Sequence, residues 1–199
     1  MRKISLYVEP FAPTGLFLLF FSWELYARMA VITSVLVHEL SHYAAMKMYG
    51  GRVERVRITA FGIGLGFSPP KTYPEEMFVA AAGPAASFAY SAIGYFDGGD
   101  FGREVFVFSL FLGIINMLPL ASFDGNRIIK AFISMLLGVE VAEKVSNALS
   151  IMFLFTTWVI AVYILFYSGV NISLLLFCAY IFIFAVVKKD CNLGNMVVQ

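Results

Sequence analysis

The most constraining feature of the sequence is an apolar stretch, residues 26–48, that also contains both histidines of the chain. Its charged side chains are Arg28, Glu39 and Lys47. A stretch of this length and polarity predicts a helix that crosses a membrane. Glu39 would then lie below the membrane surface, where an ionisable group costs at least ~2.5–3.5 kcal/mol at the helix centre. A cost of that size indicates a functional residue.

The two histidines belong to the motif His38-Glu39-Leu40-Ser41-His42. On a helix they are one turn apart and project from the same face. This is the spacing with which two imidazoles bind one Zn²⁺, and Glu39 lies close enough to that face to handle the protons of a reacting water. The alternative is a polar cluster that only holds helices together. We favour the metal site, because intramembrane ionisable residues are functional by default.

Composition supports a membrane location for the whole chain. Hydrophobic residues make up 60% of the 199 positions, charged residues make up 14%, and the mean hydropathy is +0.83. A soluble domain of this length exposes far more charge, so we expect an integral membrane protein. The net charge of +1 gives no reason to expect a nucleic-acid partner. Cys178 and Cys191 show no metal-ligand spacing, and no repeat is visible, which indicates one domain over residues 1–199.

The pattern along the chain predicts an all-α polytopic membrane protein with about six transmembrane helices and a small membrane-associated β-hairpin. The expected spans cover residues 11–23, 26–48, 74–95, 103–116, 145–167 and 170–187. An amphipathic surface helix is expected over residues 127–137. Residues 52–59 and 61–67 alternate like two strands of a hairpin, and three glycines share one face of the second. Such a face leaves room for a substrate strand, although a merely flexible connection is the alternative.

Positive charge predicts the orientation in the membrane. With six spans, twelve lysines and arginines lie on the side of both termini, whereas only Arg28 and Arg103 lie on the other. The positive-inside rule makes the first side cytoplasmic. The basic, apolar beginning also fits a signal peptide, but no convincing cleavage site precedes Arg28, so we expect a short first membrane helix.

A catalytic zinc usually takes three protein ligands, and the chain has no third histidine. A carboxylate is therefore needed, and Asp124 is the best candidate. It follows the irregular backbone after Pro119 and emerges at a depth similar to that of His42. A turn-forming Asp-Gly pair is the alternative reading of this position. Other carboxylates of the right type are Glu75, Glu76, Asp97 and Asp100, of which the last two fall on the opposite side of the membrane.

Three motifs together resemble the site-2 protease family of intramembrane zinc metalloproteases. They are the HELSH motif at 38–42, Ala82-Gly83-Pro84, and Asn116-x-x-Pro119-x-x-x-x-Asp124-Gly125. The resemblance covers about residues 26–130. It looks most like the branch containing the sporulation protease that processes a pro-sigma factor, here without room for a C-terminal CBS domain. It implies zinc held by His38, His42 and Asp124, with Glu39 as general base and Asn116 positioning the substrate.

Three positions depart from the common pattern of that family. Ser41 stands where many members have glycine, and Ser87 stands where many have asparagine. Asn126 replaces the second glycine of the common Asp-Gly-Gly. Serine is small and forms hydrogen bonds, so these changes look tolerable, but Ser87 weakens any oxyanion role carried over to that position.

The function implied is hydrolysis of peptide bonds within or next to transmembrane segments, as in regulated intramembrane proteolysis. The expected partners are a transmembrane protein or peptide substrate, the lipid bilayer and an unidentified regulatory membrane protein. The expected location is a bacterial or archaeal cell membrane, with both termini cytoplasmic. The alternative is a non-hydrolytic metal-binding membrane protein, such as a transporter or a degenerate protease. Transport usually needs polar groups along a path, whereas here they cluster at one depth. A structural partner subunit is a further alternative, but it would have no use for Glu39.

Overall fold

The structure is a computed structural model that describes residues 5–8, 24–59, 62–67, 72–120 and 123–168. Its elements in chain order are β1 (Ser5–Val8), α2 (Leu25–Met48), β2 (Val53–Thr59), β3 (Gly62–Phe67), α3 (Tyr73–Asp97), α4 (Asp100–Asn116), α5 (Asp124–Leu137) and α6 (Val139–Ser168). The predicted spans 11–23 and 170–187 lie outside the described residues, as do both cysteines. The described part is therefore predominantly helical, with five helices and three short strands.

Glycines follow the ends of the first two of these helices. Gly50 follows α2 with a φ of 72° and donates its N–H to the carbonyl of Lys47. Gly98 follows α3 with a φ of 67° and donates to Gly94. Both residues adopt the left-handed conformation that glycine tolerates best, so each helix ends at a defined residue.

Three helices begin earlier than their apolar patterns predict. The starts expected near residues 103, 127 and 145 lie instead at Asp100, Asp124 and Val139. Apolar periodicity marks only the buried or lipid-facing part of a helix, whereas polar first turns extend it. Asp100 and Asp124 lie in first turns, where a negative charge interacts favourably with the helix dipole.

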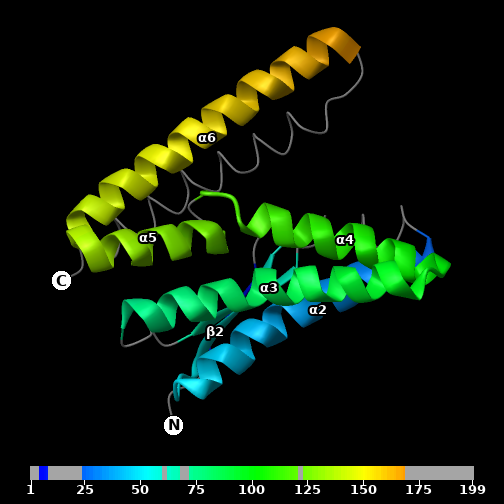
Figure 1. Cartoon of the computed structure of the whole chain (residues 1–199), viewed down its shortest axis with the longest axis horizontal. Coiled ribbons are helices and arrows are strands. Elements are labelled where there is room, and N and C mark those ends of the chain that lie inside the picture. Colours follow the sequence, from blue (N-terminus) through cyan, green and yellow to red (C-terminus); the bar gives the residue numbers. More distant parts are fainter. Residues whose placement is uncertain (1–4, 9–23, 60–61, 68–71, 121–122, 169–199) are drawn as a thin grey trace.

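Helix α3 occupies the centre of the bundle and packs against α2, α4 and α5 (Figure 1). Helices α3 and α4 pack closely because glycines at their interface let the two backbones approach each other. A β-carbon on Gly94 would lie 2.6 Å from the carbonyl oxygen of Gly102. The helix continues through Pro84, which is fully buried, and does not end there. The stretch around Pro84 thus lies at the packed middle of the molecule.

Helices α2 and α4 are joined by a polar contact in addition to apolar packing. Ser34 and Ser109 are both buried, and their hydroxyl oxygens lie 2.7 Å apart. These serines follow Arg28 and Arg103 along their respective helices.

Helix α3 is antiparallel to α2, because His42 contacts Val79 and His38 contacts Ser87. It is also antiparallel to α4, because Ser91 contacts Phe106 and Gly94 lies against Gly102. Helices α2 and α4 therefore run in the same direction, and their early arginines lie toward the same end of the bundle.

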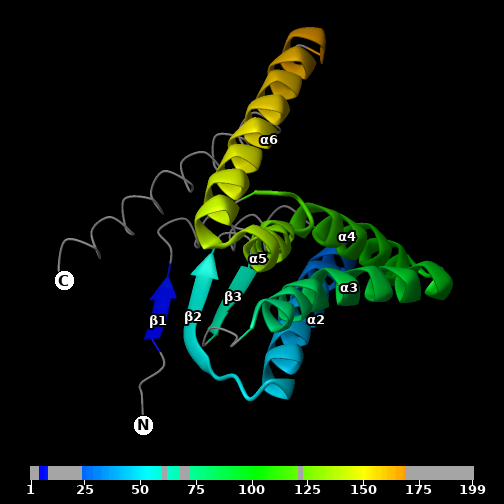
Figure 2. The same cartoon turned by 60° about the vertical axis from the view of Figure 1, so that its left-hand side comes forward.

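A three-stranded sheet lies beside this bundle (Figure 2). Strands β2 and β3 are antiparallel and pair Ile58 with Ile63, which places two strands where the sequence alternation predicts a hairpin. Strand β1 pairs in parallel with β2, a pairing that the sequence analysis did not anticipate. Strand β3 forms the edge of the sheet next to α2.

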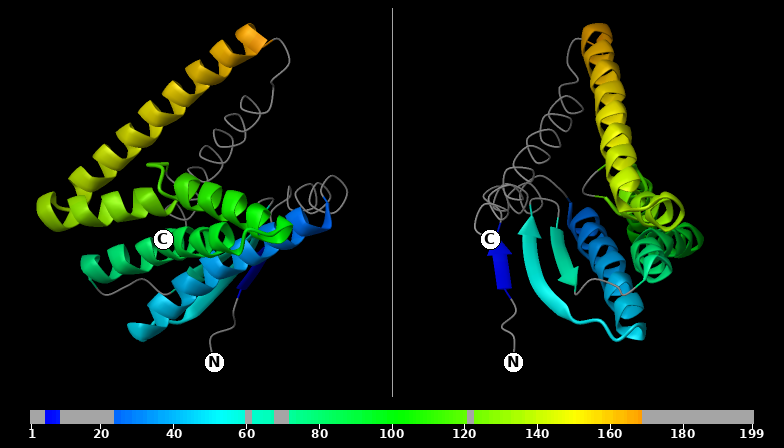
Figure 3. Two further views of the ribbon diagram at one scale, coloured as in Figure 1. Left: turned by 45° about the vertical axis from the view of Figure 1, so that its right-hand side comes forward. Right: turned by 90° about the vertical axis from the view of Figure 1, so that its left-hand side faces the viewer.

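Helix α6 extends away from the bundle and leaves much of its apolar surface exposed (Figure 3). Among the described residues, two helices are long and apolar enough to cross a membrane by length and composition alone. They are Tyr73–Asp97 and Val139–Tyr167, with mean hydropathies of 1.3 and 2.3. An exposed apolar surface of this kind fits a lipid environment.

Candidate metal centre

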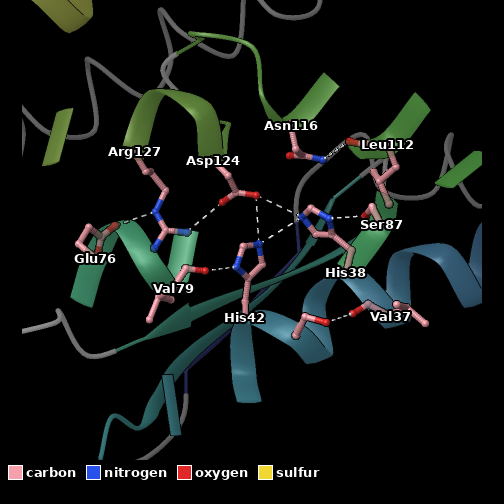
Figure 4. Close-up of polar contacts among 11 residues, drawn as sticks. Val37, His38, His42, Glu76, Val79, Ser87, Leu112, Asn116, Asp124 and Arg127 are labelled. Carbon is pink, nitrogen blue, oxygen red and sulfur yellow. Dashed lines mark hydrogen bonds and ion pairs between the residues drawn. The ribbon is translucent and has the colours of Figure 1, made fainter. Parts of the chain in front are cut away.

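Three side chains meet where α2, α3 and α5 come together (Figure 4). His38 and His42 project from the same face of α2, and Asp124 is the first residue of α5. The Oδ2 atom of Asp124 lies 3.2 Å from Nε2 of His38 and 3.0 Å from Nε2 of His42. The two Nε2 atoms lie 3.2 Å apart, and all three residues are buried. The structure thus brings together the three side chains proposed as ligands.

The His42 ring is oriented by the backbone of α3. Its Nδ1 lies 2.7 Å from the carbonyl oxygen of Val79. A carbonyl oxygen only accepts, so Nδ1 must carry the proton. In the neutral ring, Nε2 then has a lone pair directed toward Asp124 and His38. This is the tautomer and orientation that a metal-binding histidine needs.

The His38 ring is oriented by a side chain of α3. Its Nδ1 lies 2.9 Å from the hydroxyl oxygen of Ser87, which is also buried. When Ser87 accepts from Nδ1–H, the Nε2 of His38 is left unprotonated and faces the same point as the Nε2 of His42. From the sequence, Ser87 was not expected to contact a metal ligand. The structure gives it a contact with a candidate ligand.

The donor set fits a zinc ion. Two neutral imidazole nitrogens and one carboxylate oxygen are acceptors, so their convergence without a cation is unfavourable. Two atoms bound tetrahedrally at ~2.0–2.1 Å from zinc lie about 3.3 Å apart. The observed separations of 3.0 to 3.2 Å are close to this value. Among the described residues, this trio is the group of histidine and acidic side chains arranged to hold a metal.

Gly83 allows the histidines to approach α3 this closely. A β-carbon on Gly83 would overlap Nε2 of His42 and would lie 2.8 Å from Cε1 of His38. In the sequence, Gly83 is the middle residue of the Ala82-Gly83-Pro84 motif. The structure shows that the absent side chain also provides space for the two rings.

The second oxygen of Asp124 has a different partner. Arg127, one turn further along α5, donates from Nη1 to Oδ1 of Asp124 at 3.1 Å and from Nε to Oε1 of Glu76 at 2.9 Å. Burial acts to raise the pKa of Asp124, but the positive charge of Arg127 beside it acts to lower it. The hydrogen bond and charge of Arg127 therefore favour the ionised carboxylate that a metal ligand must be.

The turn that carries Asp124 is fixed from two sides. A β-carbon on Gly125 would overlap the carbonyl of Met117, so glycine is needed where the chain folds back on the end of α4. From α6, Ser146 donates to Oδ1 of Asn126 at 2.8 Å, and Ser150 donates to the carbonyl of Pro119 at 2.9 Å. Asn126, a departure from the family pattern, is thus buried and hydrogen-bonded.

The remaining predicted residues lie around this centre in different ways. Glu39 is half-buried and lies between the two histidines on α2. Asn116 ends α4, and its Nδ2 donates to the Leu112 carbonyl one turn back, so part of its amide is engaged within its own helix. Ser41 similarly donates to the carbonyl of Val37 at 2.7 Å.

The alternative carboxylates are placed elsewhere. Glu76 pairs with Arg127, and Glu75 lies beside it in the first turn of α3. Asp97 and Asp100 lie at the opposite end of α3, around its junction with α4. Asp124 is the carboxylate that the described structure brings to the histidines.

Comparison with known proteins gives three related results. The model of Peptidase family M50 matches residues 103–160. Zinc metalloprotease MJ0392 of Methanocaldococcus jannaschii is 26% identical over 137 residues, which are 62% of this chain and 40% of that protein. Putative zinc metalloprotease Rip3 of Mycobacterium tuberculosis is 32% identical over 133 residues, which are 56% of this chain and 32% of that protein. The chain thus matches well under half of the length of either relative.

The solved site-2 protease from Methanocaldococcus jannaschii has a similar fold, with a TM-score of 0.69 and 19% sequence identity. The match covers 92% of this chain and 89% of that chain. The chain therefore has the fold of that site-2 protease, and parts of it are similar to Peptidase family M50 and to two zinc metalloproteases.

Proposed function

We propose that the protein is an intramembrane zinc metalloprotease that hydrolyses peptide bonds within or next to transmembrane segments of membrane-bound substrates. The observation that carries this proposal is the buried convergence of three acceptor atoms, from His38, His42 and Asp124, within 3.2 Å of one another. A helix-borne glutamate lies between the two histidines, as in other HExxH metalloproteases. The similarity to two zinc metalloproteases supports the same chemistry.

In this proposal His38, His42 and Asp124 hold Zn²⁺, and Glu39 is the general base. The bound ion would supply Lewis acidity and make water reactive at neutral pH. Glu39 takes a proton from the attacking water and later gives it to the leaving amine. Val79 and Ser87 keep the imidazoles in the orientation that metal binding needs. The buried position of the ligands limits access of bulk water to the reaction.

The substrate is proposed to bind in an extended form. A carbonyl within an intact helix is already hydrogen-bonded and shielded, so the peptide must unwind locally. Strand β3 is the edge of the described sheet and lies next to α2, which makes it a suitable template for an added strand. Asn116, at the end of α4 near the Asp124 turn, is proposed to position the substrate backbone.

The membrane arrangement proposed is about six spans with both termini cytoplasmic, in a bacterial or archaeal cell membrane. The distribution of twelve lysines and arginines against two supports this orientation. The parallel directions of α2 and α4, which bring Arg28 and Arg103 toward one end of the bundle, also support it. Within the site-2 protease family, the short first span, the two trailing spans and the absence of an inserted PDZ domain favour the branch that processes a pro-sigma factor.

Peptide hydrolysis can be tested by comparing membrane-protein fragments from cells that express the wild type and the Glu39→Gln variant. A protease predicts fragments that depend on Glu39 and whose new ends lie in or beside apolar segments. A transporter or a degenerate protease predicts identical fragment patterns. Purified wild-type protein and a recovered substrate should then reproduce the cleavage. The absence of Glu39-dependent fragments would count against the proposed function.

A further inference from the structure

Arg127 contacts the candidate metal centre without belonging to the ligand trio (Figure 4). It lies in the first turn of α5, three residues after Asp124, and its side chain is 36% exposed. One guanidinium nitrogen, Nη1, donates to Oδ1 of Asp124 at 3.1 Å, and another, Nε, donates to Oε1 of Glu76 at 2.9 Å. Arg127 therefore connects the third ligand on α5 to the first turn of α3.

The two oxygens of Asp124 have separate partners. Oδ2 lies 3.0 and 3.2 Å from the Nε2 atoms of the two histidines, and Oδ1 accepts from Arg127. A carboxylate can bind a metal through one oxygen or through both. An arginine that occupies Oδ1 makes binding through Oδ2 alone the preferred arrangement and restricts rotation of the carboxylate.

We propose that Arg127 is a positioning residue that makes Asp124 a one-oxygen zinc ligand, and that Glu76 holds the Arg127 guanidinium in place for this role. The inference rests on the zinc site of the proposed function. Arginine suits the task because its planar group offers donors in fixed directions, so that it can hold two carboxylates at once. A lysine has one ammonium group and cannot reproduce both directions.

The charge of Glu76 supports this assignment. A lone guanidinium beside a zinc site would repel the metal ion, because like charges at short range in a poorly solvated region interact strongly. The carboxylate of Glu76 offsets that charge, while Arg127 still supplies the hydrogen bond to Oδ1. Since Glu76 lies in the first turn of α3 and Asp124 begins α5, the same bridge links the two helix ends.

The chain contains a matched control for this arrangement. Arg103 also donates to an aspartate three residues earlier, from Nη2 to Oδ1 of Asp100 at 2.8 Å. This pair likewise lies in the first turn of a helix, but its side chains are 73% and 74% exposed, and it lies at the opposite end of α3 from Glu76. Removing Arg103 therefore tests whether the loss of an aspartate–arginine pair away from the metal centre changes zinc affinity.

The experiment measures zinc affinity by competition with a chelator, using full-length protein purified in detergent. Arg127→Gln should lower the affinity by ~10–100-fold, the loss typical of a group that supports a metal ligand. Arg103→Gln should leave it at the wild-type value. Arg127→Lys should lower the zinc affinity less than Arg127→Gln does, but measurably. Glu76→Gln, which keeps an acceptor oxygen for Arg127, should lower the zinc affinity less than either Arg127 variant. Wild-type affinity in Arg127→Gln, or equal losses in Arg127→Gln and Arg103→Gln, would overturn the proposal.

Cobalt(II) provides a readout that a merely structural role would not change. If Arg127 keeps Asp124 bound through one oxygen, its removal lets the second oxygen bind, and the visible absorption of the cobalt protein should weaken as the coordination number rises. An unchanged spectrum in both Arg127 variants would contradict the assignment. If Arg127→Gln does not fold, Arg127→Lys decides, and wild-type affinity and spectrum in that variant reject the proposal. Failure of the wild type to bind zinc would instead reject the proposed function.

Discussion

The backbone of Gly83 on α3 lies directly against the imidazole ring of His42 on α2. A β-carbon at Gly83 would overlap Nε2 of the ring and would lie 2.6 Å from its Cε1. Backbone at the middle of α3 is therefore one wall of the metal centre. A single methyl group at this position should displace an atom that is proposed to bind zinc.

Gly83→Ala should weaken zinc binding by ~5–150-fold, because forcing a methyl group into a packed site typically costs ~1–3 kcal/mol. Zinc affinity of the purified, folded protein measures this effect. Gly94→Ala is the control, since its β-carbon would lie 2.6 Å from the Gly102 carbonyl, between α3 and α4. The control should lower stability and leave zinc affinity of the folded protein unchanged. Equal zinc affinity in Gly83→Ala and the wild type would contradict the geometry described.

Glu39→Gln should separate hydrolysis from metal binding. Glutamine keeps the size of glutamate but cannot accept a proton at neutral pH, so cleavage of a membrane-helix substrate should fall by ~10²–10⁴-fold. Zinc content should stay near one per chain. The double variant His38→Ala, His42→Ala should lose both metal and activity. Full cleavage by Glu39→Gln would reject Glu39 as the base even if zinc were bound.

Asp124→Ala should reduce zinc affinity by at least ~10–100-fold, because removal of a residue that only supports a ligand already costs that much. Metal analysis after dialysis against a weak chelator measures this loss. Asp100→Ala is the matched control, because Asp100 also begins a helix and pairs with an arginine three residues later. Undiminished affinity in Asp124→Ala would redirect attention to Glu75 and Glu76.

Ser146→Ala should destabilise the protein by ~1–3 kcal/mol, because it leaves the buried Asn126 side chain without its hydroxyl partner. The midpoint of thermal unfolding measures the loss. Asn147→Ala, at the neighbouring exposed position of α6, should have little effect. If the two variants unfold at the same temperature, the contact between α6 and α5 contributes nothing measurable.

Reporter fusions test the proposed membrane orientation. The excess of positive charge predicts that reporters after Gln199 and near Arg57 are cytoplasmic, whereas a reporter near Gly99 is on the other side. At each position two reporters are fused separately, one active only in the cytoplasm and one active only outside it. Activity of one reporter and inactivity of the other then assigns the side. A C-terminal reporter outside the cell would exclude the arrangement with six spans.

The sequence predicted those parts of the site that depend on local spacing. His38 and His42 share a helix face because four residues make about one turn, and Asp124 followed from the break after Pro119. The contacts of Val79, Ser87 and Arg127 were not predicted. His42 and Val79 are 37 residues apart, and Arg127 and Glu76 are 51 residues apart. Such contacts depend on how α2, α3 and α5 pack, which no local pattern specifies.

For the fold, too, local features were predicted and pairings between distant segments were not. The ends of α2 and α3 were predicted to within two residues, whereas the polar first turns of α4, α5 and α6 were missed because apolar periodicity does not extend into them. The alternation over residues 53–67 indicated two strands, but the parallel partner Ser5–Val8 lies about fifty residues earlier in the chain. Pairing over that distance leaves no signal in either segment alone.

The positions of the three ligands along the chain have a consequence for motion. Asp124 is 82 and 86 residues from the two histidines, so a metal held by all three would act as a cross-link that closes a long loop through α3 and α4. Opening of α5 away from α2 would require that cross-link to break. Chelation should therefore speed hydrogen exchange first at the beginning of α5, while the contact between α3 and α4 stays protected.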